Sequence, residues 1–166
     1  MAVLEILTYP DERLRQMSQP VTEFDARLQE RIDDLEETRL AGPGAVGIAA
    51  PQVGWFQRVV IVDVSGRKKT RNHGHLILVN PEITRWEGHK VGREGCLSVP
   101  DYTGNVVRAE KIHLDALDRE GNPLSFEMDG FEARAIQHEL DHVDGLLFLD
   151  RLVSRRQDLF RRKVYE

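Results

Sequence analysis

The chain has 166 residues, a length that predicts a single domain over residues 1–166 with a core large enough to need no disulfides. Its net charge of −5 and its lack of a basic block argue against nucleic-acid binding. It contains no long apolar run, no signal-peptide pattern and only one cysteine, Cys96, so we expect no membrane span and a cytoplasmic location.

The first third of the chain predicts an arm, a helix and a loop of small residues. Residues 4–20 are expected to form an irregular arm. From Thr22 to Leu40 apolar residues recur at helical spacing, and Thr22 is placed to cap this helix with Asp25 three residues later. Residues 45–54, AVGIAAPQVG, are rich in small side chains, which usually means a backbone that approaches another element or a ligand closely. The alternative, which this stretch by itself favours, is a tight loop that fills a small gap.

The middle of the chain predicts strands. Residues 58–64 and 76–79 are apolar enough to be core strands. Residues 105–118 alternate between apolar and polar side chains, as do residues 124–128 after the turn DREGNP. We expect these last two segments to form an antiparallel pair.

The segment Asp129–Gly145 predicts a helix enclosed on two sides. Asp129 is placed to cap its start in a capping box with Glu132, and Gly145 suits its end. Whereas a surface helix has one apolar face, this one has two at 100° per residue: Ile136, Leu140 and Val143 on one, and Phe131, Ala135, His138 and His142 on the other. Together these elements predict an α+β fold, with antiparallel or mixed sheets around this central helix, an N-terminal helix and a short C-terminal helix capped by Ser154.

The central helix contains the pattern HExxH, residues 138–142. On a helix, His138 and His142 lie one turn apart on the same face, where both can bind one metal ion. The alternative is that the two histidines are hydrogen-bonded core residues and that Glu139 is an ordinary helix former. All three residue types at the required spacing favour the metal site.

A catalytic site of this kind needs a third protein ligand. The downstream positions that supply it in HExxH proteases do not fit, because Phe148 stands where a histidine is needed and Glu166 is the only later glutamate. An upstream ligand is therefore expected, and Cys96 is the strongest candidate. The alternatives for Cys96 are a small buried hydrophobic residue or a nucleophile paired with a histidine.

Three motifs together resemble the peptide deformylases. AVGIAAPQ (45–52), EGCLS (94–98) and QHELDH (137–142) occur in the order and approximate spacing of that family, and the resemblance spans the whole chain. These enzymes remove the N-formyl group from nascent bacterial proteins. One departure is Ala45, which stands where the family usually has glycine and would be strained if that position needs a positive φ.

The resemblance implies that Cys96, His138 and His142 bind one divalent metal ion, with a water molecule as the fourth ligand. In this family the ion in the cell is typically Fe(II), and Zn, Ni or Co can occupy the same site. The implied partners are the N-formylmethionyl peptides of nascent chains, with association with the ribosome as an open alternative.

The resemblance also assigns roles to the residues around the metal. Glu139 is expected to take a proton from water and pass it to the departing amine. The Gln52 side-chain amide and the Leu97 backbone N–H are expected to stabilise the negative charge on the formyl oxygen.

Further residues are expected to hold the substrate. Val46 and Gly47 would pair with the extended peptide as an added strand, and Gly95 would offer a backbone carbonyl. Phe131 and Ala135, on the same helix face as the histidines, are the candidates for the methionine pocket.

Two other functions compete with this one. An HExxH endopeptidase would share the water chemistry but cleave internal bonds. A non-enzymatic metal-binding or peptide-binding module would hold a structural ion, which needs four protein ligands.

Overall fold

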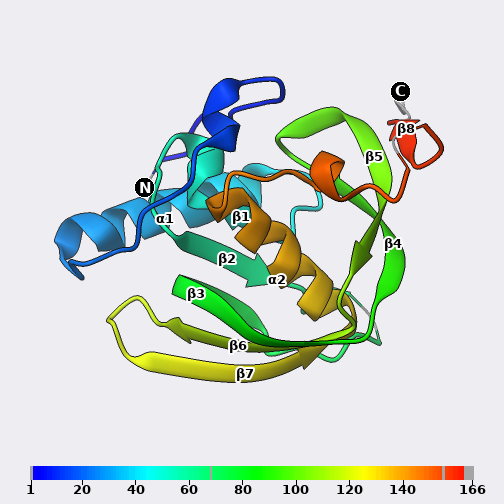
Figure 1. Ribbon diagram of the computed structural model, residues 1–166. Coiled ribbons are helices and arrows are strands. Elements are labelled where there is room, and N and C mark those ends of the chain that lie inside the picture. Colours follow the sequence, from blue (N-terminus) through cyan, green and yellow to red (C-terminus); the bar gives the residue numbers. More distant parts are fainter. Residues whose placement is uncertain (1, 68, 155, 163–166) are drawn as a thin grey trace.

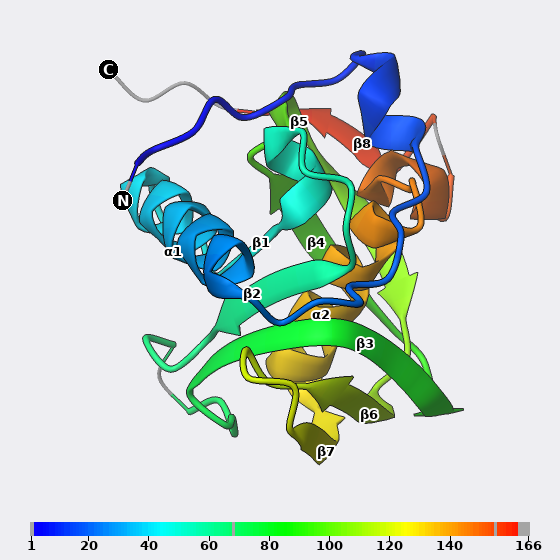
Figure 2. The ribbon, with the colours of Figure 1, turned by 90° about the vertical axis from the view of Figure 1, so that its left-hand side faces the viewer.

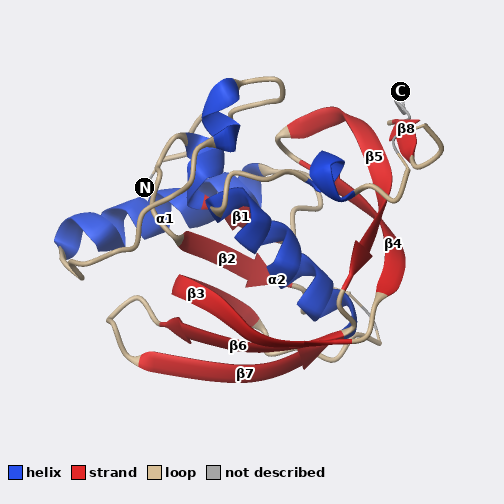
Figure 3. Cartoon of the chain, in the orientation of Figure 1, coloured by secondary structure: helices blue, strands red, loops and turns tan. Residues whose placement is uncertain are grey.

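The computed structural model describes residues 2–67, 69–154 and 156–162. Within these residues the chain forms two α-helices, three short 3-10 helices and eight strands (Figures 1 and 3). The strands build two sheets in which every pairing is antiparallel. The predicted α+β class is confirmed. None of the helices in these residues is long and apolar enough to cross a membrane.

The larger sheet has five strands in the order β1-β2-β3-β6-β7. The strands are β1 (Gly47–Ala49), β2 (Val59–Asp63), β3 (His75–Glu87), β6 (Lys111–Leu117) and β7 (Pro123–Asp129). The predicted pairing of the last two is confirmed, since Leu114 lies opposite Phe126. The predicted strand at 76–79 is the first part of β3, which is much longer.

The smaller sheet has three strands in the order β4-β5-β8. They are β4 (Lys90–Cys96), β5 (Val99–Arg108) and β8 (Leu159–Arg161). The predicted segment 105–118 is therefore divided between two sheets, because the chain leaves the smaller sheet after Arg108 and enters the larger one at Lys111. The alternating pattern of apolar and polar side chains over residues 105–118 spans the boundary between β5 and β6, so the sequence does not indicate the change of sheet.

The central helix α2 (Gly130–Val143) lies across one face of the larger sheet, with the smaller sheet beyond its other side (Figure 1). Nearly all of its residues from Glu132 onward are buried. Gly145 adopts a φ of +77° just past the end of the helix, as predicted. The predicted capping box is wrong, because Asp129 makes no side-chain cap and the Glu132 carboxylate accepts hydrogen bonds from His73 instead.

Helix α1 (Ala26–Ala41) covers the face of β1 and β2 opposite to α2 (Figure 2). It begins later than predicted, because the Asp25 carboxylate, and not Thr22, caps it by accepting from Leu28 N–H. Val60 and Val62 of β2 face α2, while Val59 and Ile61 face α1. A strand buried on both faces needs the continuous apolar run seen in the sequence.

The N-terminal arm, which includes a 3-10 helix at Glu12–Arg15, joins the loops that carry the site motifs. Leu7 N–H donates to Gln52 O at 2.7 Å, and Tyr9 N–H donates to Ser98 O at 2.7 Å. The arm therefore fixes the short 3-10 helix Ala50–Val53 against the turn that follows β4.

The predicted C-terminal helix is wrong for the residues that the structure describes. Residues 148–151 form a single 3-10 turn, and residues 159–161 form β8, which pairs with β5 (Figure 3). The Ser154 backbone and hydroxyl oxygens accept from Asp158 and Gln157 N–H within a turn. The remaining positions of that prediction, 155 and 163–166, lie outside the described residues.

Candidate active site

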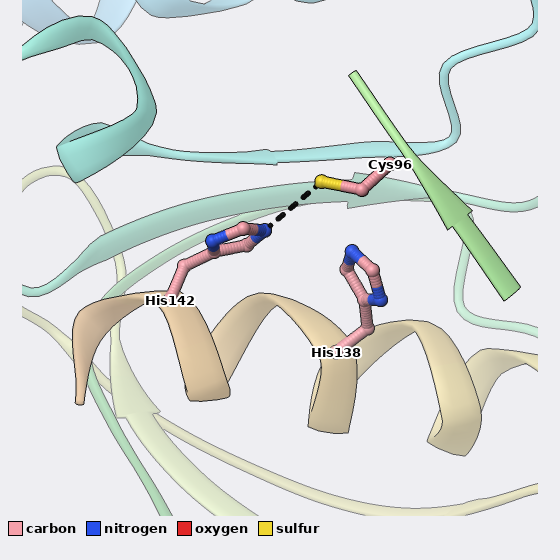
Figure 4. A group of neighbouring side chains, drawn as sticks. All are labelled: Cys96, His138 and His142. Carbon is pink, nitrogen blue, oxygen red and sulfur yellow. Dashed lines mark hydrogen bonds between the residues drawn. The ribbon is translucent and has the colours of Figure 1, made fainter. Parts of the chain in front are cut away.

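One sulfur and two imidazoles meet above helix α2 (Figure 4). Cys96 ends β4, and His138 and His142 lie one turn apart on α2. Their ligand atoms all lie within 4.8 Å of one another, and Cys96 Sγ lies 3.3 Å from His142 Nε2. The latter distance is close to the roughly 3.5 Å expected between a sulfur and a nitrogen that bind one tetrahedral ion. These three residues therefore fit a divalent transition metal in both chemistry and spacing.

The charges around the three residues also suit a metal ion. Burial lowers the pKa of His142 well below its usual value, so its ring is neutral, as a metal ligand must be. Burial alone would lower the pKa of His138 too, but hydrogen bonds with Cys96 and Glu94 raise it well above its usual value. The neighbouring groups that favour a proton on this ring would equally favour a metal ion in the place of that proton.

Glu94 orients His138 from behind. Its carboxylate lies 2.8 Å from His138 Nδ1, which leaves the other ring nitrogen to face Cys96. Arg108 donates two hydrogen bonds to the same carboxylate, at 2.9 and 3.0 Å, and Arg134 a third at 2.6 Å. Although burial acts in the opposite direction, hydrogen bonds from His138 and Arg108 hold the pKa of Glu94 well below its usual range. Sequence analysis missed Glu94, although a charged residue two positions before the motif cysteine was a signal for it.

Glu139 lies beside the histidines without binding to either. Its Oε1 is buried and has no hydrogen-bond partner among the described residues. Burial raises the pKa of this carboxyl to about 7. A group with that pKa can both accept and donate a proton near neutral pH.

The loop of small residues approaches the Glu139 carboxylate closely at Gly47. A Cβ added at Gly47 would lie 2.6 Å from Glu139 Oε2. The expected close approach is therefore found, and its partner is the carboxylate of the HExxH motif. Among the described residues only Lys69 and Asn80 have a positive φ without being glycine, so Ala45 is free of the strain considered above.

Gln52 links the loop of small residues to the cysteine motif. Its Oε1 accepts from Ala49 N–H at 2.9 Å, and its Nε2 donates to Ser98 Oγ at 3.0 Å and lies 3.5 Å from Cys96 Sγ. The amide group is thus fixed at both ends and faces the sulfur. Sequence analysis did not foresee Ser98, whose hydroxyl sets the orientation of this amide.

The predicted site residues line one cavity of about 360 Å³, apart from His142, which lies deeper. One end of the cavity holds Cys96, His138 and Glu139, with Gln52 and Leu97 beside them. The residues expected to hold the peptide and the methionine lie on its walls: Val46, Gly47, Gly95, Phe131 and Ala135. Arg67, Arg93, Arg134 and Arg162 also line it, and sequence analysis missed them because they come from four separate elements.

Comparison with known proteins finds one family and several solved structures that are similar to this chain over nearly its whole length. A family model described as polypeptide deformylase matches residues 3–158. A curated peptide deformylase from Thermodesulfovibrio yellowstonii is 43% identical over 163 residues, which cover 98% of this chain and 97% of that protein. The crystal structure of a peptide deformylase from Legionella pneumophila has a TM-score of 0.85 at 44% identity, covering 93% of this chain and 90% of that one. The structure of a peptide deformylase from Ehrlichia chaffeensis in complex with actinonin has a TM-score of 0.86 at 35% identity, covering 94% and 92%.

Proposed function

The chain belongs to the polypeptide deformylase family, and on this basis we propose which of its residues carry the family's reaction. The enzyme is a hydrolase that removes the N-formyl group from the N-terminal formylmethionine of new proteins and releases formate. We assign Cys96, His138 and His142 as the metal ligands and Glu139 as the group that moves the proton. The observation that carries this assignment is the convergence of the three ligand atoms within 4.8 Å.

A metal ion held by Cys96, His138 and His142 would supply Lewis acidity to the formyl oxygen and would lower the pKa of water from about 15.7 to about 7. Glu139 takes a proton from the attacking water while the water oxygen forms its bond to the formyl carbon. Glu139 then passes that proton to the methionine nitrogen as the carbon–nitrogen bond breaks, which gives formate and a free amino group. The buried, unpartnered Oε1 of this side chain supports the role.

Negative charge develops on the formyl oxygen during the attack and needs hydrogen-bond donors. We assign the Gln52 side-chain amide and the Leu97 backbone N–H to this role. Support for Gln52 comes from its amide nitrogen, which faces Cys96 Sγ and is fixed by Ser98. Loss of one such donor typically costs about 3 kcal/mol in transition-state stabilisation.

We assign Val46, Gly47 and Gly95 to the peptide backbone of the substrate and Phe131 and Ala135 to the methionine side chain. All five line the cavity that holds the proposed catalytic residues, which supports this division. Recognition through the backbone accepts many sequences after the first residue, as an enzyme acting on most new chains requires.

The proposed ligands are tested by metal analysis together with a formate-release assay on formyl-Met-Ala-Ser. We expect Cys96→Ala and His138→Ala to lose both metal content and activity. His113→Ala is the matched control, because His113 lies on β6 and interacts with Glu127 and Asp115 on the sheet surface. Full metal content in Cys96→Ala would refute the proposed ligand set.

We propose Fe(II) as the ion in the cell, with Zn, Ni or Co able to replace it, because one thiolate and two imidazoles suit all of these metals. Fe(II) and its thiolate ligand are both oxidisable. We therefore expect the iron-loaded enzyme to lose formate-release activity during purification in air, while the zinc-loaded enzyme keeps its activity. Equal loss of activity in both forms would contradict the proposed role of iron.

We further propose that the chain is one catalytic domain that works in the cytoplasm, where it meets nascent chains at the ribosome. Its single buried cysteine and the contacts of α2 with both sheets, apolar with the larger sheet and through Glu94 and Arg108 with the smaller one, support this proposal. Ribosome association is tested by co-sedimentation of the purified enzyme with ribosomes, with release by salt as the control for non-specific binding.

A further inference from the structure

Positive charge gathers at the rim of the substrate cavity. The exposed charged residues among its described lining residues are Arg67, Arg93 and Arg162, which we call the arginine rim. The two acidic lining residues, Glu94 and Glu139, are both buried, and Glu94 is already bound to Arg108 and Arg134. Because the whole chain carries a net charge of −5, this concentration of arginine is a local feature.

Aromatic rings hold two members of the arginine rim in place. The Arg67 guanidinium lies 3.8 Å from the centre of the Phe131 ring, and that of Arg93 lies 3.7 Å from the centre of the Phe160 ring. Arg93 also donates to Asn105 Oδ1 at 3.1 Å. Within the described residues, none of the three rim arginines is paired with a carboxylate. Their guanidinium groups are thus held at the cavity while their charge stays available.

The arginine rim adjoins the residues assigned to the substrate. Arg67 stacks on Phe131 of the proposed methionine pocket. A Cβ added at Gly95 would lie 2.6 Å from Arg162 Nη2, and Arg93 precedes Gly95 by two residues on β4. A peptide bound at Gly95 therefore carries its following side chains past at least two guanidinium groups.

Building on the proposed function, we propose that the arginine rim binds carboxylate groups of the peptide beyond its formylmethionine. The enzyme then favours formylated chains with aspartate or glutamate in their first few positions and disfavours those with lysine. Planar guanidinium groups match carboxylates in shape and charge. Each exposed contact between a guanidinium group and a carboxylate should change kcat/KM a few-fold. The three together should give about a tenfold preference for acidic over basic peptides.

The proposal is tested with three C-terminally amidated peptides, formyl-Met-Ala-Ser, formyl-Met-Glu-Glu and formyl-Met-Lys-Lys. We expect kcat/KM to be about tenfold higher for the glutamate peptide than for the lysine peptide at low salt. The preference should shrink in high salt, because the screening length falls from about 30 Å at 0.01 M to about 3 Å at 1 M. Comparing kcat/KM for formyl-Met-Ala-Ser with a free and with an amidated C-terminus shows whether a C-terminal carboxylate also binds to the arginine rim.

The triple variant Arg67→Gln, Arg93→Gln, Arg162→Gln should bring the glutamate-to-lysine ratio close to one. Arg85→Gln is the matched control, since Arg85 is exposed on β3, pairs with Glu127 and lies outside the cavity lining. Equal kcat/KM for the charged peptides in the unaltered enzyme, or an unchanged ratio in the triple variant, would overturn the proposal. Absence of turnover of the neutral peptide would instead refute the proposed residue roles, so the two failures are separable.

Discussion

The contact between Gly47 and Glu139 shows how single residues set the geometry of the active site. Gly47 begins β1, and its missing side chain leaves the space that the Glu139 carboxylate occupies. The Gly47 backbone thereby restricts the position of this carboxylate by steric contact. It makes no hydrogen bond to Glu139 Oε1 that would compete for the proton. A glycine at this place serves close approach and not a positive φ, since its φ is not in that range.

Gly47→Ala should therefore reduce activity while the protein stays folded. The added methyl would displace the Glu139 carboxylate, and a shift of about 1 Å in a reacting group can cost about a hundredfold in rate. The measurement is kcat/KM for formyl-Met-Ala-Ser, with circular dichroism to verify folding. Gly66→Ala is the control, because a Cβ there meets nothing within 4 Å. Unchanged kcat/KM in Gly47→Ala would show that the carboxylate does not need its present position.

Glu139→Gln should keep the metal and lose turnover. The amide has the same shape but cannot accept the proton of water, and general base catalysis contributes about 10²- to 10⁴-fold. We expect unchanged metal content by elemental analysis and a fall of that size in kcat. The control is Glu127→Gln, a glutamate on the exposed face of β7. If the Glu139 variant lost its metal, this residue would be a ligand and its assignment would be wrong.

At this scale the HExxH spacing predicted that two imidazoles share one helix face, and the family resemblance proposed Cys96 as their partner, which the structure brings within 4.8 Å of them. The roles of Glu94, Ser98 and the arginine rim were not predicted, although Glu94 and Ser98 lie in the same motif as Cys96, because these roles depend on contacts between segments far apart in the chain. No spacing rule relates Gln52 to Ser98 or Arg67 to Phe131.

The ends of the helices show what decides an element's boundary. Asp25 is placed to cap α1 because its carboxylate reaches Leu28 N–H, whereas Glu132 at the start of α2 is drawn away by His73. The periodicity of apolar residues predicted both helices correctly. Their first residues depend on single hydrogen bonds that compete with tertiary contacts, and these do not appear in a pattern of hydrophobicity.

Gly145 ends α2 against the N-terminal arm, and its replacement should destabilise the protein strongly. It has a φ of +77°, and an added Cβ would lie 2.4 Å from Arg15 O. Gly74 is a matched control, with a φ of +78° and nothing within 4 Å of such a Cβ.

We expect Gly74→Ala to lower the free energy of unfolding by about 1–2 kcal/mol from backbone strain alone. Gly145→Ala should lose about 1–3 kcal/mol more, because the arm must move. Urea unfolding curves measure both. Equal losses of unfolding free energy in the two variants would mean that the N-terminal arm moves away from the added methyl group without destabilising the protein.

At the scale of the whole molecule, one buried arginine connects the smaller sheet to α2. Arg108 at the end of β5 donates to Glu94 of β4 and, at 2.5 Å, to Asp141 of α2. Despite the opposing effect of burial, hydrogen bonding to Glu94 raises the pKa of Arg108, so the side chain stays charged. The larger sheet, by contrast, meets α2 through apolar contacts.

Arg108→Met should cost about 3–5 kcal/mol in the free energy of unfolding, because it removes one charged partner from each of two buried carboxylates, Glu94 and Asp141. Arg85→Met removes a similar side chain from an exposed pair and should change stability by less than about 1 kcal/mol. The midpoint of urea unfolding measures the difference. A small effect at Arg108 would mean that Arg134 and Arg151, which also contact these carboxylates, are sufficient.

The overall class followed from the order of the predicted elements and from a central helix with two apolar faces. The division into two sheets did not, because the alternation of side chains continues from β5 into β6. The C-terminal strand was missed for a similar reason: a segment of three residues is too short to show a period, and its pairing with β5 is a long-range event.

Burial of α2 on every side restricts how this enzyme can vary. Between Ala135 and Val143 each residue is buried. These positions are taken up by core packing, by the proposed ligands and Glu139, or by the hydrogen bonds and ion pairs of Gln137 and Asp141. Sequence drift, and any escape from an inhibitor seated in the cavity, must therefore fall on the walls supplied by loops and strand edges. The arginine rim, whose side chains are exposed, belongs to these walls.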